Sequence, residues 1–498
     1  MSNPISPAFS EYWSTCNADE QALLHRFFVG FSEHCLLRNK TKRLLREDLE
    51  KAILYYLENG RTLEQALALL DCKYLGGFYA RPPKLWFPLD DAAKIYPLSM
   101  EHGVMSVFRL SVYLKAQIVP ELLQVALNFT VKRFPTFTTT LKKGFFWHYL
   151  DTAKRRFCVE QERDIPCQPL KVSQSNSPTF RVIYYENRIS MELFHVLTDA
   201  TGALTFLKVL VAEYLRLLGV EVSPDENLWD INETPQTEEF ENAFCNVPKT
   251  SNSSGFVDKA AVQMNGKITE AKPCRVLHFK MKSDELKAAS SRHGITVTGY
   301  LLAQMFLSCK AAMDEIRGEM SIQLPVNMRK YYPSKTVRNF SMYCGIRLPV
   351  DHITAIDDII PEIREQMKTK TAKDVMSEML NATEKLVNML RFIPLVIKQP
   401  VAKLVYGFLG EKLFTSTLSN MGVVQFPSAI AEHIESMDFA LGTSVLNRVS
   451  CSVVTVNDAV TFTVSKITAD PSFEEKMYDL LTADGIEVAV EGSELYGY

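Results

Sequence analysis

The sequence of 498 residues lacks metal-binding cysteine spacings, long apolar runs and a strong charge of one sign, each of which would indicate a class of protein directly. Its ten cysteines form no CxxC pair and no Cys/His spacing of the kind that binds zinc, so no metal site is predicted. No stretch reaches the roughly 20 apolar residues of a membrane span. The charge is balanced, with 55 Lys and Arg against 58 Asp and Glu. We therefore expect a soluble protein with no transmembrane segment and no nucleic-acid partner.

Catalytic motifs with fixed spacing are also missing. No GxxxxGK[ST] or GxGxxG loop is present, so a phosphate-bearing ligand cannot be located from the sequence. No GxSxG elbow is present, which argues against a serine hydrolase of the α/β type. The opening MSNPISPAFSEYW is polar rather than a secretory signal. Together with scattered cysteines, this favours a cytoplasmic protein.

What the sequence does contain is an α-helical beginning. Apolar residues recur at helical spacing in residues 22–37 and 43–57. Thr62 is followed three residues later by Gln65, which is a capping box and predicts the start of a third helix. Residues 1–80 are therefore predicted to form a helical extension. The alternatives left open are that it packs against the main body or binds a partner.

Strands and helices alternate from about residue 85 onward. The length calls for two or three domains, and residues 220–272 are polar without sustained periodicity. We predict an α/β (α+β) fold with lobes at 81–219 and 273–498 joined by a linker at 220–272. The strands are expected at 107–114, 137–141, 180–186, 188–195, 276–281, 321–329, 444–458 and 459–467, and the helices at 119–135, 202–219, 283–294, 296–313 and 471–485.

One segment combines apolar and basic character. Residues 390–412, LRFIPLVIKQPVAKLVYGFLGEK, contain two prolines and interspersed lysines. This pattern favours kinked helices in the core. A membrane-surface segment or the lining of an acyl channel is the alternative.

The most informative passage is MELFHVLTDATGALTFL. A strand-like run ends at His195, Asp199 follows four residues later, and Gly202 opens a helical pattern. An imidazole titrates near pH 6.5, so it is mostly neutral at pH 7 and can accept a proton as a general base. The spacing alone favours a structural histidine and an aspartate that caps the next helix.

The surrounding motifs extend this pattern into a resemblance. HxxxDxxG after a strand resembles the active-site signature of the chloramphenicol acetyltransferase-like superfamily, which includes condensation domains and alcohol acetyltransferases. LDDAAKIYPLS (89–99) resembles the opening of the alcohol acetyltransferase-like branch. LPVNMRKYY (324–332), with Asn339 beyond it, and TLSNMG (417–422) resemble two later segments. The resemblance covers about residues 85–490.

Two departures narrow the resemblance. Condensation domains carry two adjacent histidines, whereas Phe194 precedes His195 here. The DFGWG box of plant-type relatives is absent, and SNMG is its nearest counterpart. A single histidine favours an acyltransferase that uses a thioester over peptide synthesis.

The resemblance implies a two-lobed sandwich with an inter-lobe tunnel, and it implies roles for five residues. His195 would be the general base for transfer of an acyl group from an acyl thioester, such as acyl-CoA, to a small alcohol or amine. Asp199 would pair with Arg329 and hold the loop. Ser419 and Asn420 are candidates for supporting the oxyanion. Acyl-CoA would be a co-substrate, with no tightly bound cofactor and no metal.

Two other functions remain as alternatives. A binding or scaffolding protein of the same fold would have lost turnover. A condensation enzyme would take its acyl group from a carrier protein, which would then be a further partner.

Overall fold

A computed structural model describes most of the chain. The described residues are 6–35, 37–71, 86–98, 105–153, 156–170, 178–249, 259–400, 411–442 and 446–496. Parts of the predicted helical extension (72–80), of the predicted linker (250–258) and of the apolar basic segment (401–410) lie outside them.

The N-terminal part of the chain, up to Leu69, is built of helices. Its helices are α1 (Pro7–Thr15), α2 (Ala18–His34), α3 (Asn39–Glu58) and α4 (Leu63–Leu69). The predicted capping box is confirmed, because Thr62 Oγ1 accepts from the Gln65 amide while the Gln65 side chain accepts from the Thr62 amide. Asn17 and Glu20 form a second capping box at the start of α2.

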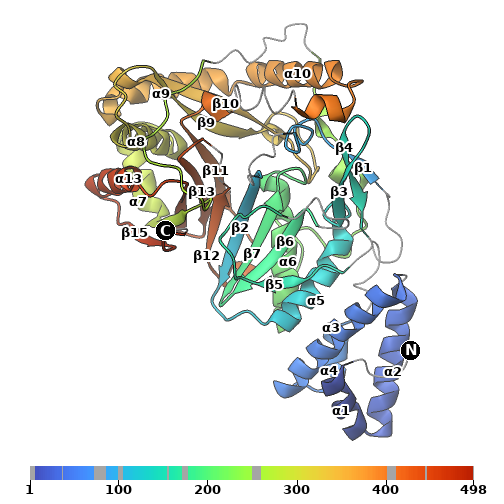
Figure 1. The fold of residues 1–498 in the computed structure, drawn as a ribbon. Helices are drawn as coiled ribbons and strands as arrows, with labels where there is room; N and C mark the ends of the chain where they lie inside the picture. Colours follow the sequence, from blue (N-terminus) through green and yellow to red (C-terminus); the bar gives the residue numbers. More distant parts are fainter. Residues whose placement is uncertain are drawn as a thin grey trace.

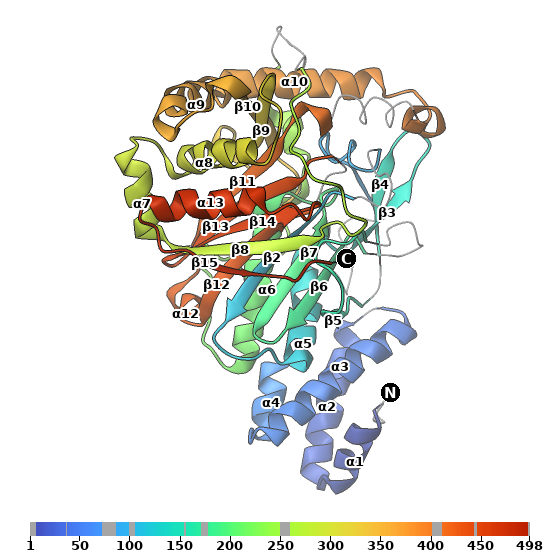
Figure 2. The same cartoon turned by 60° about the vertical axis from the view of Figure 1, so that its left-hand side comes forward.

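This helical module packs against the main body, below it in Figures 1 and 2, where α3 lies beside α5 (Pro120–Thr130). The Tyr56 hydroxyl donates to the Leu217 carbonyl at 2.7 Å. The buried Asp48 carboxylate accepts from Asn128 Nδ2 at 2.9 Å and from Arg156 Nε at 2.6 Å. Apolar side chains of the module and of the first lobe form one continuous core. Of the two alternatives, the structure therefore shows packing against the body.

The first lobe is built on a five-stranded sheet in the order β12-β2-β7-β6-β5. Helix α6 (Ala200–Leu218) packs against β2 and β7, and it ends at Gly219, whose positive φ of 99° caps the helix. A three-stranded sheet, β1-β4-β3, stands beside it. The strands are β1 (Trp86–Pro88), β2 (Val107–Leu114), β3 (Thr139–Lys143), β4 (His148–Thr152), β5 (Val159–Gln161), β6 (Phe180–Tyr185), β7 (Arg188–Phe194) and β12 (Ile434–Leu441).

The second lobe is built on a seven-stranded sheet in the order β10-β9-β11-β13-β14-β8-β15. Its strands are β8 (Arg275–Lys282), β9 (Glu319–Asn327), β10 (Ser341–Pro349), β11 (Ser416–Val424), β13 (Val449–Val456), β14 (Ala459–Lys466) and β15 (Ala489–Gly492). The helices are α7 (Ser283–Arg292), α8 (Val297–Ala311), α9 (Ile356–Lys370), α10 (Lys373–Met389), α12 (Ser428–Ala431) and α13 (Ser472–Ala483). A separate hydrophobic core lies here.

The two sheets meet where β12 packs against β13 and β14. Strand β12 comes from the predicted second lobe, yet it pairs antiparallel with β2 of the first. The chain thus crosses between the lobes near residue 434. This crossing brings the end of β12 next to the end of β7, because both flank the beginning of β2.

The described part of the apolar basic segment differs from the expected core helices. Phe392 is 75% exposed and Val396 is 84% exposed. Leu395 and Lys398 are the buried members of this stretch. No helix of the described ranges combines the length and the apolar character that crossing a bilayer requires.

Candidate active site

His195 lies directly after β7, at the junction of strands from both halves of the chain. Its backbone N–H donates to the Ser106 carbonyl at 2.8 Å. Its half-buried ring stacks on Tyr96, with centroids 4.6 Å apart and planes inclined by 22°. Phe108 lies on it at 5.2 Å in a tilted arrangement. These rings hold the imidazole in an apolar setting.

Asn339 determines which nitrogen of His195 carries the proton. Its Nδ2 donates to the His195 carbonyl at 3.0 Å and contacts Asp90 Oδ2 at 3.3 Å. This arrangement leaves Asn339 Oδ1 as an acceptor, 2.9 Å from His195 Nδ1. The hydrogen-bond network therefore assigns the proton to Nδ1 and the free lone pair to Nε2.

The electrostatic setting keeps the ring neutral. Burial lowers the pKa of His195 below its ordinary value of about 6.5, although Asp199, Asn339 and Asp90 oppose the shift. Burial also raises the pKa of Asp90, which is fully buried beside Arg338 with 3.5 Å between Oδ2 and Nη2. A neutral imidazole with a lone pair on Nε2 is the state that a general base needs.

Asp199 is both a helix cap and an ion-pair partner, so the two interpretations open at the sequence level are not exclusive. Its Oδ1 accepts from the Gly202 amide at 3.0 Å, which caps α6. Its Oδ2 accepts from Arg329 Nη1 at 2.7 Å and from the Phe340 amide at 2.8 Å. Among the described residues, no hydrogen bond joins this carboxylate to the His195 ring.

Arg329 binds the backbone that precedes Asn339. Its Nη2 donates to the carbonyls of Thr336 at 2.8 Å and of Arg338 at 2.7 Å. The Arg338 carbonyl and the Phe340 amide flank Asn339 in the chain. Asp199 and Arg329 therefore hold the backbone on both sides of the residue that orients His195.

Ser419 and Asn420 lie on β11, where they pair with Ser452 and Val453 of β13. Asn420 Nδ2 donates to Thr298 Oγ1 at 2.9 Å, and its Oδ1 accepts from the Gly422 amide at 2.8 Å. Within the described residues, no hydrogen bond joins either side chain to His195. Their role as oxyanion donors stays a prediction.

Three residues of this site had no role assigned from the sequence. Asp90, Tyr96 and Asn339 fall in or beside segments that carried the family resemblance, which was the only signal pointing to them. Tyr96 contacts His195 across 99 residues of sequence, and Asp90 contacts Asn339 across 249, so no local sequence pattern predicts these contacts. In the described part of the chain, no three His, Cys, Asp or Glu side chains are grouped to hold a metal ion.

Solved structures share this architecture at low sequence identity. Polyketide synthase associated protein 5 from Mycobacterium tuberculosis aligns with a TM-score of 0.55 and 13% identity, covering 80% of this chain and 98% of that one. TRI101 of F. graminearum, complexed with coenzyme A and T-2 mycotoxin, gives 0.54 and 9%, covering 81% and 100%. The first condensation domain of the calcium-dependent antibiotic synthetase gives 0.53 and 11%, covering 82% and 100%. No curated protein sequence shows significant similarity.

The chain thus has the two-lobed fold of condensation domains and related acyltransferases, which confirms the predicted fold class. Within that class, residues 166–470 match the model of the alcohol acetyltransferase family. Since the match spans more than half of the chain, the protein belongs to this family, and the predicted resemblance is confirmed. Acyl transfer is its general reaction class.

Proposed function

We propose that the protein transfers an acyl group from an acyl thioester, with acyl-CoA as donor, to an alcohol or amine, and that His195 is the general base. The observation that carries the proposal is the hydrogen bond of 2.9 Å between His195 Nδ1 and Asn339 Oδ1, which leaves Nε2 to accept a proton. Family membership supports the reaction class.

In the proposed reaction, His195 Nε2 accepts the proton of the acceptor hydroxyl or amine as that atom attacks the thioester carbonyl carbon. The carbonyl π electrons move onto oxygen, and the tetrahedral intermediate forms. Collapse of this intermediate restores the carbonyl and breaks the carbon–sulfur bond. The departing thiolate takes the proton from Nε2, so His195 returns to its starting state without a covalent enzyme intermediate.

The remaining residues act through His195 or on the oxyanion. Asn339 Oδ1 stabilises the transient imidazolium by accepting from Nδ1. Asp199 and Arg329 are positioning residues, because their contacts hold the backbone around Asn339. Asn420 has a second Nδ2 hydrogen beyond the one given to Thr298, and Ser419 has a hydroxyl, so both stay candidates for binding the oxyanion.

A thiol-release assay tests the proposal. Wild-type protein, supplied with acetyl-CoA and a panel of alcohols and amines, is expected to release free thiol. His195→Ala is expected to lower kcat by about 10²- to 10⁴-fold, because a positioned general base contributes that much.

The matched control is His352→Ala, since His352 is an exposed histidine in the second lobe. This variant should retain wild-type activity. Equal turnover by wild type and His195→Ala would refute the role of His195. Transfer from a phosphopantetheinyl carrier protein, with none from free acetyl-CoA, would show that the acyl donor is a carrier protein and not acyl-CoA. The proposed role of His195 as general base would then still stand.

A further inference from the structure

A group of exposed apolar side chains lies where the end of α10 meets the turn between β3 and β4. Phe145 is 71% exposed at this turn, and Met389 is 72% exposed at the end of α10. We call this surface the apolar rim. It consists of Phe145, Phe146, Met389, Phe392, Val396 and Ile397.

The two segments of the rim are joined rather than merely adjacent. The Leu395 amide donates to the Phe145 carbonyl at 2.8 Å, and Lys398 Nζ donates to the Phe146 carbonyl at 2.8 Å. The rings of Phe146 and Phe392 meet edge to face at 6.4 Å. The exposed side chains are thus presented by an ordered surface.

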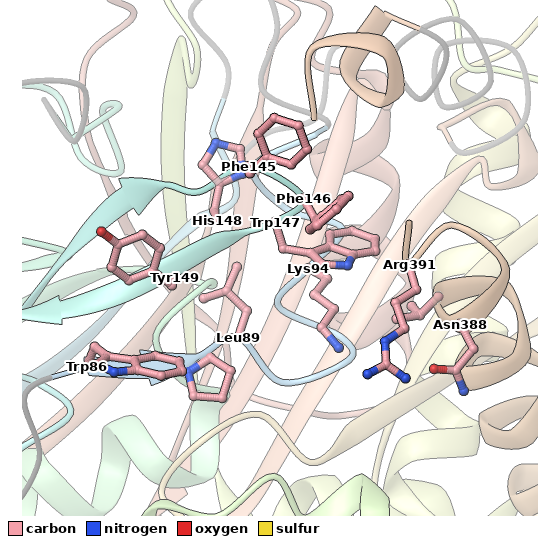
Figure 3. Close-up of a pocket in the computed structure, with 12 residues that line it drawn as sticks. Trp86, Leu89, Lys94, Phe145, Phe146, Trp147, His148, Tyr149, Asn388 and Arg391 are labelled. Atoms are coloured by element: carbon pink, nitrogen blue, oxygen red, sulfur yellow. The ribbon is translucent and has the colours of Figure 1, made fainter. Parts of the chain in front are cut away.

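A pocket of about 760 Å³ opens beside the rim and shares Phe145 and Phe146 with it. Figure 3 shows the aromatic rings of Phe146 and Trp147 above the side chains of Lys94 and Arg391. Lys94 lies two residues before Tyr96, which stacks on His195. The segment that lines this pocket therefore also contacts the proposed base.

The charge of the surface has one sign. Residues 385–400 contain three cations and no Asp or Glu, and residues 142–149 contain two lysines and no carboxylate. Lys385 and Arg391 are exposed, whereas Lys398 is buried with its Nζ on the Phe146 carbonyl, so it supports the surface from below and does not face the headgroups. The nearest preceding acid, Glu384, is paired with Lys249. The whole chain is net acidic, at −3. Cations set among exposed aromatic and aliphatic side chains are the combination that binds an anionic membrane interface.

We propose that the apolar rim docks on the surface of an anionic lipid bilayer, with Phe392, Val396 and Phe145 inserted among the lipids and the cations at the headgroups. A protein partner is a poorer match, because it would have to cover six exposed apolar side chains in segments whose only charged residues are cations. Docking would set the mouth of the pocket against the lipid. It does not depend on turnover, so it can fail while the proposed acyltransferase activity stands.

Vesicle co-sedimentation of the full chain tests the docking. Wild type is expected to sediment with phosphatidylcholine vesicles that contain phosphatidylserine, and less with phosphatidylcholine alone or at high salt. Phe392→Ser combined with Val396→Ser should lower the partition coefficient by at least about tenfold, since the bilayer would no longer bury these two apolar side chains. Arg391→Glu should weaken binding to the anionic vesicles only.

Ile316→Ser is the matched control, because Ile316 is 73% exposed in the loop before β9 and lies outside the rim. It should bind like wild type. Circular dichroism should show every variant folded, because the substituted side chains are exposed. Wild type that sediments with neither vesicle, or a double variant that binds as wild type does, overturns the proposal. Light scattering that shows a dimer dissociated by the double substitution, without vesicle binding, assigns the rim to a second copy instead.

Discussion

Among the described residues, the imidazole of His195 is held by contacts on its ring faces and at Nδ1, and no hydrogen bond occupies Nε2. Tyr96 and Phe108 pack on its ring, and Asn339 binds its Nδ1. Burial lowers its pKa, so the neutral form is already dominant below pH 6.5. Because protonation removes the base, kcat/KM should be constant at neutral pH. It should fall as the pH drops through the folded-state pKa, below 6.5.

Replacement of Asn339 by Ala tests this arrangement at the residue scale. We expect kcat to fall about tenfold or more, because the ring loses the contact that orients it and stabilises its charged form. The hydrogen bond that His195 Nδ1 donates to Asn339 Oδ1 raises the pKa of His195, so its loss should move the acid limb of the pH profile to lower pH.

The measurement is kcat and KM across pH for wild type and Asn339→Ala. A purely structural role for Asn339 would change stability and leave the midpoint of the acid limb where it was. That result would contradict the proposed positioning role.

At the scale of elements, the site depends on the close approach of α6 to the segment before β10. A Cβ atom on Gly202 would lie 2.1 Å from the Val337 carbonyl oxygen and 2.3 Å from Thr198 Oγ1. Asp199 caps the same helix and binds the Phe340 amide. Only glycine allows α6 to approach the Val337 carbonyl this closely, because a backbone carbonyl cannot shift without moving the chain on both sides of it.

Gly202→Ala is therefore expected to destabilise the fold by about 1–3 kcal/mol, as overpacking does, and to lower kcat by displacing Asn339. Urea unfolding with parallel kinetics measures both effects. Gly30→Ala is the control, since Gly30 lies within α2 with nothing within 4 Å of the added Cβ. That substitution should be neutral or stabilise by up to about 1 kcal/mol. Equal effects of the two substitutions would contradict the steric argument.

At the scale of the whole molecule, the helical module is part of one core with the first lobe. Its attachment includes the buried Asp48, which binds Arg156 Nη2 at 2.5 Å and Asn128 Nδ2 at 2.9 Å. These bonds cross from the module to the first lobe. The module is thus built into the body and should unfold with it.

Asp48→Ala should lower the free energy of unfolding by about 3 kcal/mol, because it leaves buried donors without their acceptor. Thermal and urea unfolding measure this loss. Glu47→Ala is the control, since Glu47 makes a partly exposed i,i+4 pair with Lys51 and should cost less than about 1 kcal/mol. Comparable losses from both substitutions would show that the buried contacts do not secure the module.

The sequence by itself determined features that depend on neighbours along the chain. The capping box at Thr62 and Gln65, the strand that ends at His195, and the helix that ends at Gly219 follow from short-range hydrogen bonds and periodicity. The family resemblance, carried by motifs of a few residues, led to the correct fold class.

Only the tertiary structure decided which distant groups meet. Asn339 binds His195 across 144 residues of sequence, and Asp90 binds Asn339 across 249, through side-chain contacts that no local pattern encodes. The crossing of β12 into the first sheet joins the lobes in the same way. The exposure of Phe392 and Val396 went against their apolar pattern, because hydrophobicity favours burial without specifying what the rest of the chain leaves uncovered.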